Sequence, residues 1–202
     1  MNTVVALAIS ALLIGVNGFF VGVEISFVAA RQTKLDALAD DGALGARVAA
    51  SATSNITPQL FAAQFGITVA SLILGLIAEQ AVASIIESVL DGVVDIPEGL
   101  LHGIGFATAL VLVVFVHTVF GEMVPKNIAI AHPETSARFL APVHRLVVTV
   151  VSPIIWVLKQ LSKPLLRLAR VDPDEIGTAH TPEELVRMLD ASREGGLVEE
   201  QE

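Results

Sequence analysis

The sequence predicts an all-α membrane protein with three transmembrane helices, amphipathic juxtamembrane helices and a short cytosolic helical tail. Of its 202 residues, 53% are hydrophobic and only 16% are charged, whereas soluble domains carry about 25% charged residues. The charges are also uneven, because they gather in 31–47 and from Arg167 onward. Long apolar runs separated by short charged segments are typical of a membrane domain.

Three apolar runs are each long enough to cross a bilayer, which takes about 20 mainly apolar residues. They cover 4–30, 60–89 and 101–130. We therefore expect residues 1–135 to form the transmembrane domain.

A fourth apolar run, Phe139–Leu168, differs because prolines divide it and basic residues occur along it at intervals. Basic side chains along an apolar surface are typical of helices that lie in the membrane interface. We predict a juxtamembrane helical belt over 136–170, with a fourth span over Leu140–Leu158 as the alternative.

The loop charges predict the orientation of the chain. The first loop contains Arg31, Lys34 and Arg47, whereas the loop between the second and third runs has acidic residues and no lysine or arginine. The positive-inside rule then places the first loop and the C-terminus in the cytoplasm and the N-terminus outside. We expect a multi-pass protein of the plasma (inner) membrane.

The polar segments are expected to be helical as well. In the first loop, Leu35, Leu38 and Ala39 share one face of a short amphipathic helix. The tail 171–202 begins a helix at a capping box headed by Thr181, and another helix begins near its end. This pattern predicts a cytosolic linker to a further soluble domain.

Composition excludes several classes of function. The chain has no cysteine, so it has neither a disulfide nor a thiolate metal site, and its formal net charge of -9 argues against nucleic-acid binding. We find no constellation of catalytic residues and predict that the chain is not an enzyme.

The first apolar run contains a cluster of small and polar residues. Gly18 and Gly22 form a pair that permits close helix approach, and Asn17 and Glu24 share a face because they are two turns apart. Polar groups at membrane depth usually face a bundle interior. Glu24 is interpreted as an acid of an ion site or, alternatively, as a partner of Arg31. The candidate residues of this run are Asn17, Gly18, Gly22, Glu24 and Ser26.

The second run carries a polar stripe. Gln64, Thr68 and Ser71 follow a helical spacing, with Gly66 among them. Their oxygens suit either a hard cation or hydrogen bonds to a neighbouring helix.

The third run ends in "VFGEMVPKN". Pro125 has no N–H, so it frees the carbonyl of Gly121 beside the carboxylate of Glu122, which favours a cation site. The alternative is a salt bridge between Glu122 and Lys126. His117 alone is expected to be a packing histidine, and an oxygen-only site favours Mg²⁺ over Zn²⁺.

Together, "NGFFVGVEISFVAARQTKL", "QFGITVASLILGLIAE", "VFGEMVPKNIAI" and "TPEELVRMLDASREGGLVEEQE" resemble the CNNM/CorC family, whose membrane domain is of the DUF21 type and whose bacterial branch is haemolysin-like. The resemblance implies three transmembrane helices, a juxtamembrane belt, a homodimer, and a following CBS-domain pair that binds nucleotide. It also implies Mg²⁺ efflux coupled to Na⁺ entry.

The resemblance implies that Glu122 is the family's signature acid. The family's two second-helix asparagines correspond to Ile67 and Ser71, and its first-helix serine to Val21 or Ser26, so some of its ligands are replaced here. Glu24, Gln64, Thr68 and Ser71 are expected to compensate, together with the Gly121 carbonyl. Two alternatives remain: an exporter of cationic amines such as diamines, and a membrane scaffold or regulator that transports nothing.

Overall fold

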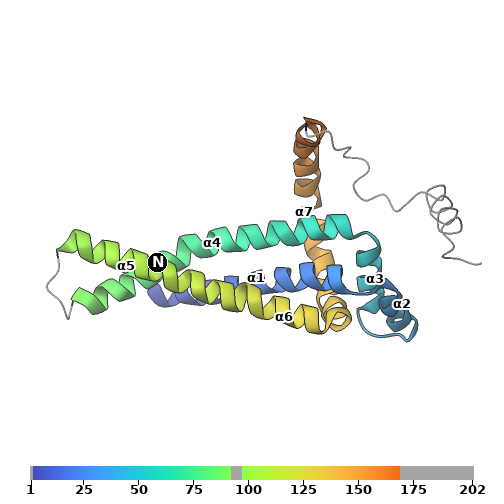
Figure 1. Ribbon diagram of the computed structural model, residues 1–202, viewed down its shortest axis with the longest axis horizontal. Coiled ribbons are helices and arrows are strands. Elements are labelled where there is room, and N and C mark those ends of the chain that lie inside the picture. The colour runs from blue at the N-terminus through green and yellow to red at the C-terminus, as the bar shows by residue number, and fades with distance from the viewer. Residues whose placement is uncertain (1, 92–96, 169–202) are drawn as a thin grey trace, which may run out of the picture. The chain divides into compact units, whose positions relative to one another are not determined.

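The structure is a computed structural model that describes residues 2–91 and 97–168, and every described element is helical (Figure 1). The elements are α1 (Thr3–Ala29), α2 (Gln32–Asp40), α3 (Ala46–Ser54), α4 (Ile56–Asp91), α5 (Glu98–Val116), the π-helix η1 (His117–Met123), α6 (Val124–Ala131) and α7 (Pro133–Leu168). The all-α prediction is confirmed.

The long helix α1 is the centre of the bundle. It packs against α4 on one side and against η1 and α6 on another, and α5 runs antiparallel beside α4 (Figure 1). Large apolar side chains such as Leu12, Leu72 and Val111 point away from the bundle and are about two-thirds exposed. An apolar outer surface of this extent is what a bilayer requires.

The first loop forms two short helices rather than the single one that we predicted. Leu35 is the residue of α2 that is fully buried, and it joins a core with Phe27 and the alanines of α3. Gly42 and Gly45, which both have positive φ angles, lie between α2 and α3. The two glycines therefore end one helix and start the next.

These two glycines provide a matched test of the packing. Both have φ near +75°, but Gly42 faces open space, whereas a side chain at Gly45 would meet the backbone carbonyl of Arg138. We expect Gly42→Ala to lose about 1–2 kcal/mol of unfolding free energy, and Gly45→Ala to lose about 1–3 kcal/mol more through overpacking. Thermal unfolding in detergent would measure both, and equal losses would contradict the packing.

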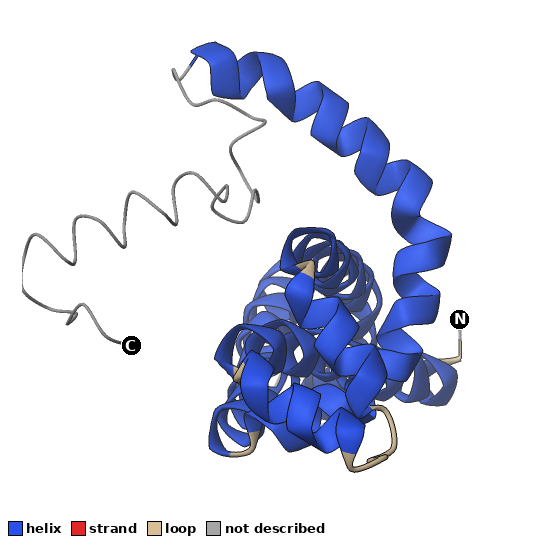
Figure 2. Cartoon of the chain, turned by 90° about the vertical axis from the view of Figure 1, so that its right-hand side faces the viewer, coloured by secondary structure: helices blue, strands red, loops and turns tan. Residues whose placement is uncertain are grey.

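The chain divides into two compact units after Ile155, and the first part of α7 belongs to the unit that contains the bundle. Leu140 lies against Gly22 of α1, and Arg138 lies against Gly45. The buried His144 ring packs edge-on against Phe27, and its Nε2 lies 3.2 Å from the carbonyl oxygen of Gln59 in α4. Fewer than three turns of α7 thus contact α1, α4 and the residue before α3. The orange part of α7, up to Ile155, passes behind α1 and α4 near the α3 end of the bundle in Figure 1, and Figure 2 shows the molecule from that end.

The predicted count of three spans is wrong, because the described residues contain four helices long and apolar enough to cross a membrane. The fourth is Pro133–Pro164, with a mean hydropathy of 1.7 in its most apolar window. The prolines that seemed to divide this run do not interrupt the helix. Its basic residues are also spaced so widely that its most apolar 18-residue window holds two charged residues at most.

Several predictions concern residues that the structure does not describe. The acidic loop falls largely within 92–96, and the capping box at Thr181 and the linker 171–202 fall within 169–202.

Candidate functional site

The third candidate span changes its helical winding next to Pro125. From His117 to Met123 the chain is a π-helix, and the N–H of Val124 donates to the carbonyl of Val119, five residues back. A proline inside a regular helix removes one hydrogen bond and clashes with the carbonyl four residues earlier. The wider π-turn accommodates Pro125 in a helix that continues to Ala131, and such π-turns often occur at functional sites.

The carbonyl of Gly121 has a partner from another helix. Asn17, which is fully buried in α1, donates from Nδ2 to this oxygen at 2.9 Å. The Oδ1 atom of Asn17 in turn accepts from the hydroxyl of Ser71 in α4 at 3.0 Å. One amide side chain therefore joins three helical segments. The freed carbonyl that the sequence predicts as a cation ligand is hydrogen-bonded in this structure.

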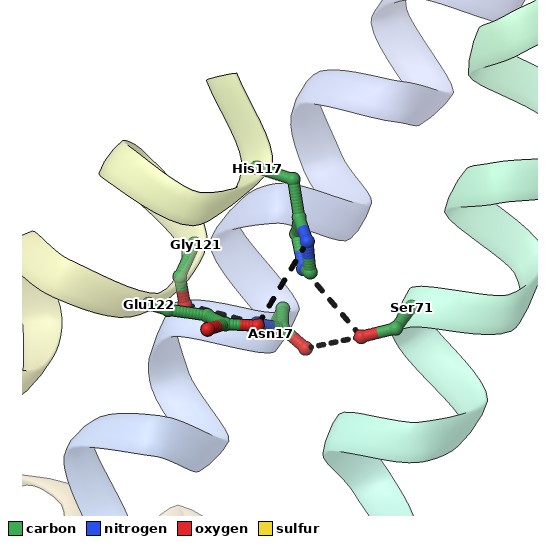
Figure 3. A network of polar contacts seen from close by, with 5 residues as sticks. All are labelled: Asn17, Ser71, His117, Gly121 and Glu122. Carbon is green, nitrogen blue, oxygen red and sulfur yellow. Dashed lines mark hydrogen bonds and ion pairs between the residues drawn. The ribbon is translucent and has the colours of Figure 1, made fainter. Parts of the chain in front are cut away.

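His117 and Glu122 complete a cluster with Asn17, Ser71 and Gly121, which is called the cluster below. The Nε2 atom of His117 lies 3.5 Å from the Ser71 hydroxyl, and its Nδ1 lies 3.9 Å from Oε1 of Glu122. Figure 3 shows these side chains converging with Asn17 between the helices. The Glu122 side chain remains 42% exposed in the single chain, against 16% for His117, so the carboxylate is the accessible end of the cluster.

The cluster lies near the middle of three candidate spans. Asn17, Ser71 and His117 are one, two and two residues from the midpoints of Thr3–Ala29, Ile56–Leu90 and Gly99–Ala131. Polar groups at this depth are costly unless they have partners or a function.

Glycines allow the helices to come this close. A Cβ atom on Gly121 would lie 2.8 Å from the His117 ring and 3.3 Å from Nδ2 of Asn17. A Cβ atom on Gly18 would lie 2.8 Å from the Pro125 ring. The Gly18/Gly22 pair thus serves contacts within one chain, since Gly22 faces Leu140.

The structure brings together only part of the predicted site. Asn17, Ser71, Gly121 and Glu122 meet, whereas Gln64 and Thr68 are exposed and Thr68 donates to the carbonyl of Gln64 in its own helix. These two residues therefore lie outside the cluster. Gly66, on the same helix, packs against the Phe20 ring.

Two candidates from α1 also lie outside the cluster. Ser26 is fully buried and donates to the carbonyl of Val23 in its own helix. Glu24 is partly buried, and among the described residues it has no hydrogen bond or ion pair, with Arg31 or any other group. Glu24 is seven residues from Asn17, which corresponds to roughly 10 Å along a helix.

The residue that the sequence analysis missed is His117. Glu122 approaches this histidine, and the alternative pair with Lys126 does not form in the described structure, where Lys126 is exposed. On a regular helix, residues five apart diverge by roughly 140°, so His117 and Glu122 would face apart. The i→i+5 winding of η1 brings them together, and the only signal for it was the proline.

Asn17 is expected to be a main structural support of the cluster. Asn17→Leu removes two buried hydrogen bonds and should lose about 1–3 kcal/mol of unfolding free energy. Ser10→Ala is the matched control on α1, because the buried Ser10 hydroxyl bonds only to the carbonyl of Ala6 in its own helix. Unfolding measured in detergent should separate the variants, and similar losses would contradict a bridging role for Asn17.

Comparison with known proteins identifies the family. Residues 8–202 match the domain described as the Cyclin M transmembrane N-terminal domain. The chain belongs to the CNNM family. The cluster of this CNNM domain includes Gly121 and Glu122 of the "GEMVPK" segment, on which the resemblance was based. Both the family and the apolar helices indicate a multi-pass membrane protein.

Relatives of this CNNM domain occur in several bacteria. The chain is 37% identical over 203 residues to the uncharacterized protein Rv1841c of Mycobacterium tuberculosis, covering 100% of this chain and 57% of that protein. It is 30% identical over 199 residues to the UPF0053 protein YhdT of Bacillus subtilis, covering 98% and 43%. It is 32% identical over 195 residues to the UPF0053 protein sll0260 of Synechocystis, covering 94% and 42%. The chain thus spans about half the length of these relatives.

Proposed function

We propose that this CNNM domain transports divalent cations across the plasma membrane, with Mg²⁺ as the cargo and Na⁺ entry as the driving reaction. The observation that carries the proposal is the convergence of Asn17, Ser71, His117 and Glu122 at mid-span, where the carboxylate side chain remains 42% exposed among apolar helices. An intramembrane acid with polar neighbours marks an ion pathway, and family membership supports the same reading.

The chemistry of the cluster suits a transported cation, which has to be released after it binds. The described residues contain no group of three or more His, Asp or Glu side chains that could hold a metal ion. A cation at Glu122 would therefore keep several of its waters, as Mg²⁺ usually does. Binding of this kind is weak enough for release, which transport requires.

On the side of the cluster toward the N-terminus of α1, the helices surround a space that is lined mainly by apolar side chains. A crevice of about 370 Å³ lies between α1, α4 and α5, one to two turns from the cluster. Its lining includes Ile14, Leu74 and Val116. A space with an apolar lining beside an ion site can exclude water and so hinder the passage of ions, and this crevice is our candidate for the part of the pathway that an alternating-access cycle would open and close.

The partially exposed carboxylate also supports the predicted homodimer. Glu122 would be costly against lipid, so a second copy or a water-filled vestibule must cover it. The orientation with the N-terminus outside, and control by nucleotide in a following CBS domain, are parts of the same proposal.

Flux measurements in proteoliposomes test the function. We expect wild-type protein to move Mg²⁺ when an opposing Na⁺ gradient is present and to move little without one. Cadaverine flux without Mg²⁺ flux would favour the amine exporter. The absence of any flux or cation-dependent stabilisation, with protein that is folded, would favour the scaffold or regulator.

A further inference from the structure

The direction of the hydrogen bonds in the cluster can be deduced from the Gly121 carbonyl. A carbonyl only accepts, so the Asn17 group that faces it must be the amide nitrogen, and the Oδ1 atom of Asn17 must be an acceptor. The Ser71 hydroxyl fills that acceptor with its single hydrogen. Ser71 therefore has no hydrogen left for His117.

This direction determines what the two ring nitrogens of His117 do. Because Ser71 can only accept, the contact of 3.5 Å is a hydrogen bond only when Nε2 of His117 carries the hydrogen and donates it. A neutral imidazole with its hydrogen on Nε2 has a lone pair on Nδ1. That lone pair faces Oε1 of Glu122 at 3.9 Å.

A lone pair and a carboxylate repel each other unless a proton or a metal cation lies between them. Metal bonds to nitrogen and oxygen are about 2.1 Å long, so two ligand atoms of one ion can be at most roughly 4.2 Å apart. The Nδ1–Oε1 distance of 3.9 Å is within that limit. One divalent ion can therefore bind both atoms at once.

We infer that His117 is a direct nitrogen ligand of the transported cation and sets its selectivity, so that the cargo class includes first-row transition metals such as Mn²⁺ as well as Mg²⁺. The inference rests on the proposed function and deepens it. Imidazole suits Fe²⁺, Ni²⁺, Cu²⁺ and Zn²⁺, whereas carboxylate and water suit Mg²⁺ and Mn²⁺, so a site with one imidazole and one carboxylate accepts ions of both groups. The oxygen-only site that the sequence predicts thus becomes a mixed site in which His117 supplies the discrimination and Glu122 the charge.

The neighbouring groups fit this division of roles. Asn17 and Ser71 are occupied by their own hydrogen bonds, so they position the imidazole rather than bind the ion. Donation from Nε2 to a fixed acceptor is the usual way in which a protein orients a metal-binding histidine.

Pulsed electron paramagnetic resonance of the purified chain with Mn²⁺ tests the inference. We expect the electron spin echo of Mn²⁺ bound to the wild-type chain to be modulated by a directly bound ¹⁴N nucleus. After labelling with ¹⁵N-histidine, a ¹⁵N signal should replace this ¹⁴N modulation. The labelling keeps the test valid even if a variant does not fold. His117→Gln should abolish the modulation and lower the ratio of Mn²⁺ to Mg²⁺ affinity by at least roughly tenfold, the lower end of the range for loss of an outer-shell partner of a metal site. His132→Gln, at an exposed histidine, is the matched control and should change neither.

The outcomes separate the two proposals. Mn²⁺ binding that depends on Glu122 but shows no nitrogen modulation would overturn the role of His117 and leave cation transport standing. If Glu122→Gln changed the binding of neither Mn²⁺ nor Mg²⁺, the proposed function and the inference would both be overturned.

Discussion

Replacing Glu122 with glutamine is expected to abolish Mg²⁺ transport in proteoliposomes and to remove the stabilisation of the folded chain by divalent cations. Glutamine keeps the size and most of the polarity of the side chain but removes its charge. Glu122 is the only carboxylate in the cluster that the described residues form, so no other group there can neutralise the ion. The shift of the thermal unfolding midpoint with Mg²⁺ concentration, together with flux, measures the effect.

Glu24→Gln provides the matched control for this substitution. Both acids lie in candidate spans, but Glu24 has no contact with the cluster in the described structure. We expect Glu24→Gln to retain cation-dependent stabilisation and flux. If Glu24→Gln abolished both while Glu122→Gln did not, the site would lie elsewhere on α1.

Substituting Gly121 with alanine is expected to produce the second large effect, because the new methyl group would enter the cluster itself. It would lie 2.8 Å from the His117 ring and 3.3 Å from Nδ2 of Asn17. Overpacking of this kind costs about 1–3 kcal/mol, and displacement of the Asn17 amide adds the loss of its bond to the Gly121 carbonyl. We therefore expect lower thermal stability together with loss of cation binding.

Gly103→Ala is the control for Gly121→Ala, because Gly103 lies in the same candidate span and has open space around it. Replacing a helical glycine with alanine there should be neutral or slightly stabilising. Cation-dependent stabilisation that Gly121→Ala retained in full would show that the close approach of the helices at this glycine is not needed for binding.

The all-α class and the first three spans were predictable because a bilayer imposes a long, nearly uncharged helix on each crossing. The fourth candidate span, Pro133–Pro164, was not. Its prolines and basic residues are also typical of an interfacial belt, and composition alone does not separate the two. The packing of the segment up to Ile155 against the bundle depends on contacts such as Gly22–Leu140 that join distant parts of the chain.

The residues of the cluster were predictable where the signal was local. Glu122, Gly121 and Pro125 are adjacent in sequence, and the chemistry of proline pointed to the Gly121 carbonyl. The partner of that carbonyl, Asn17, lies on another helix, and helical periodicity gives a face but no neighbour. Gln64, Thr68 and Ser71 form one stripe by spacing, yet only Ser71 reaches the cluster.

The role of His117 required knowledge of the helical winding. On a regular helix the histidine and the carboxylate diverge, and only the π-turn at His117–Met123 aligns them. A proline near an acidic residue at the end of an apolar run is thus a reason to consider residues five apart as well as four.

The most direct test is the location of the cation itself, by anomalous diffraction from crystals of the protein grown with Mn²⁺. We predict a peak within about 2.5 Å of a Glu122 carboxylate oxygen, a distance typical of a bound divalent ion, on the side that faces His117. A peak at the exposed Gln64 and Thr68 side chains, with no peak at Glu122, would contradict the assignment of the site.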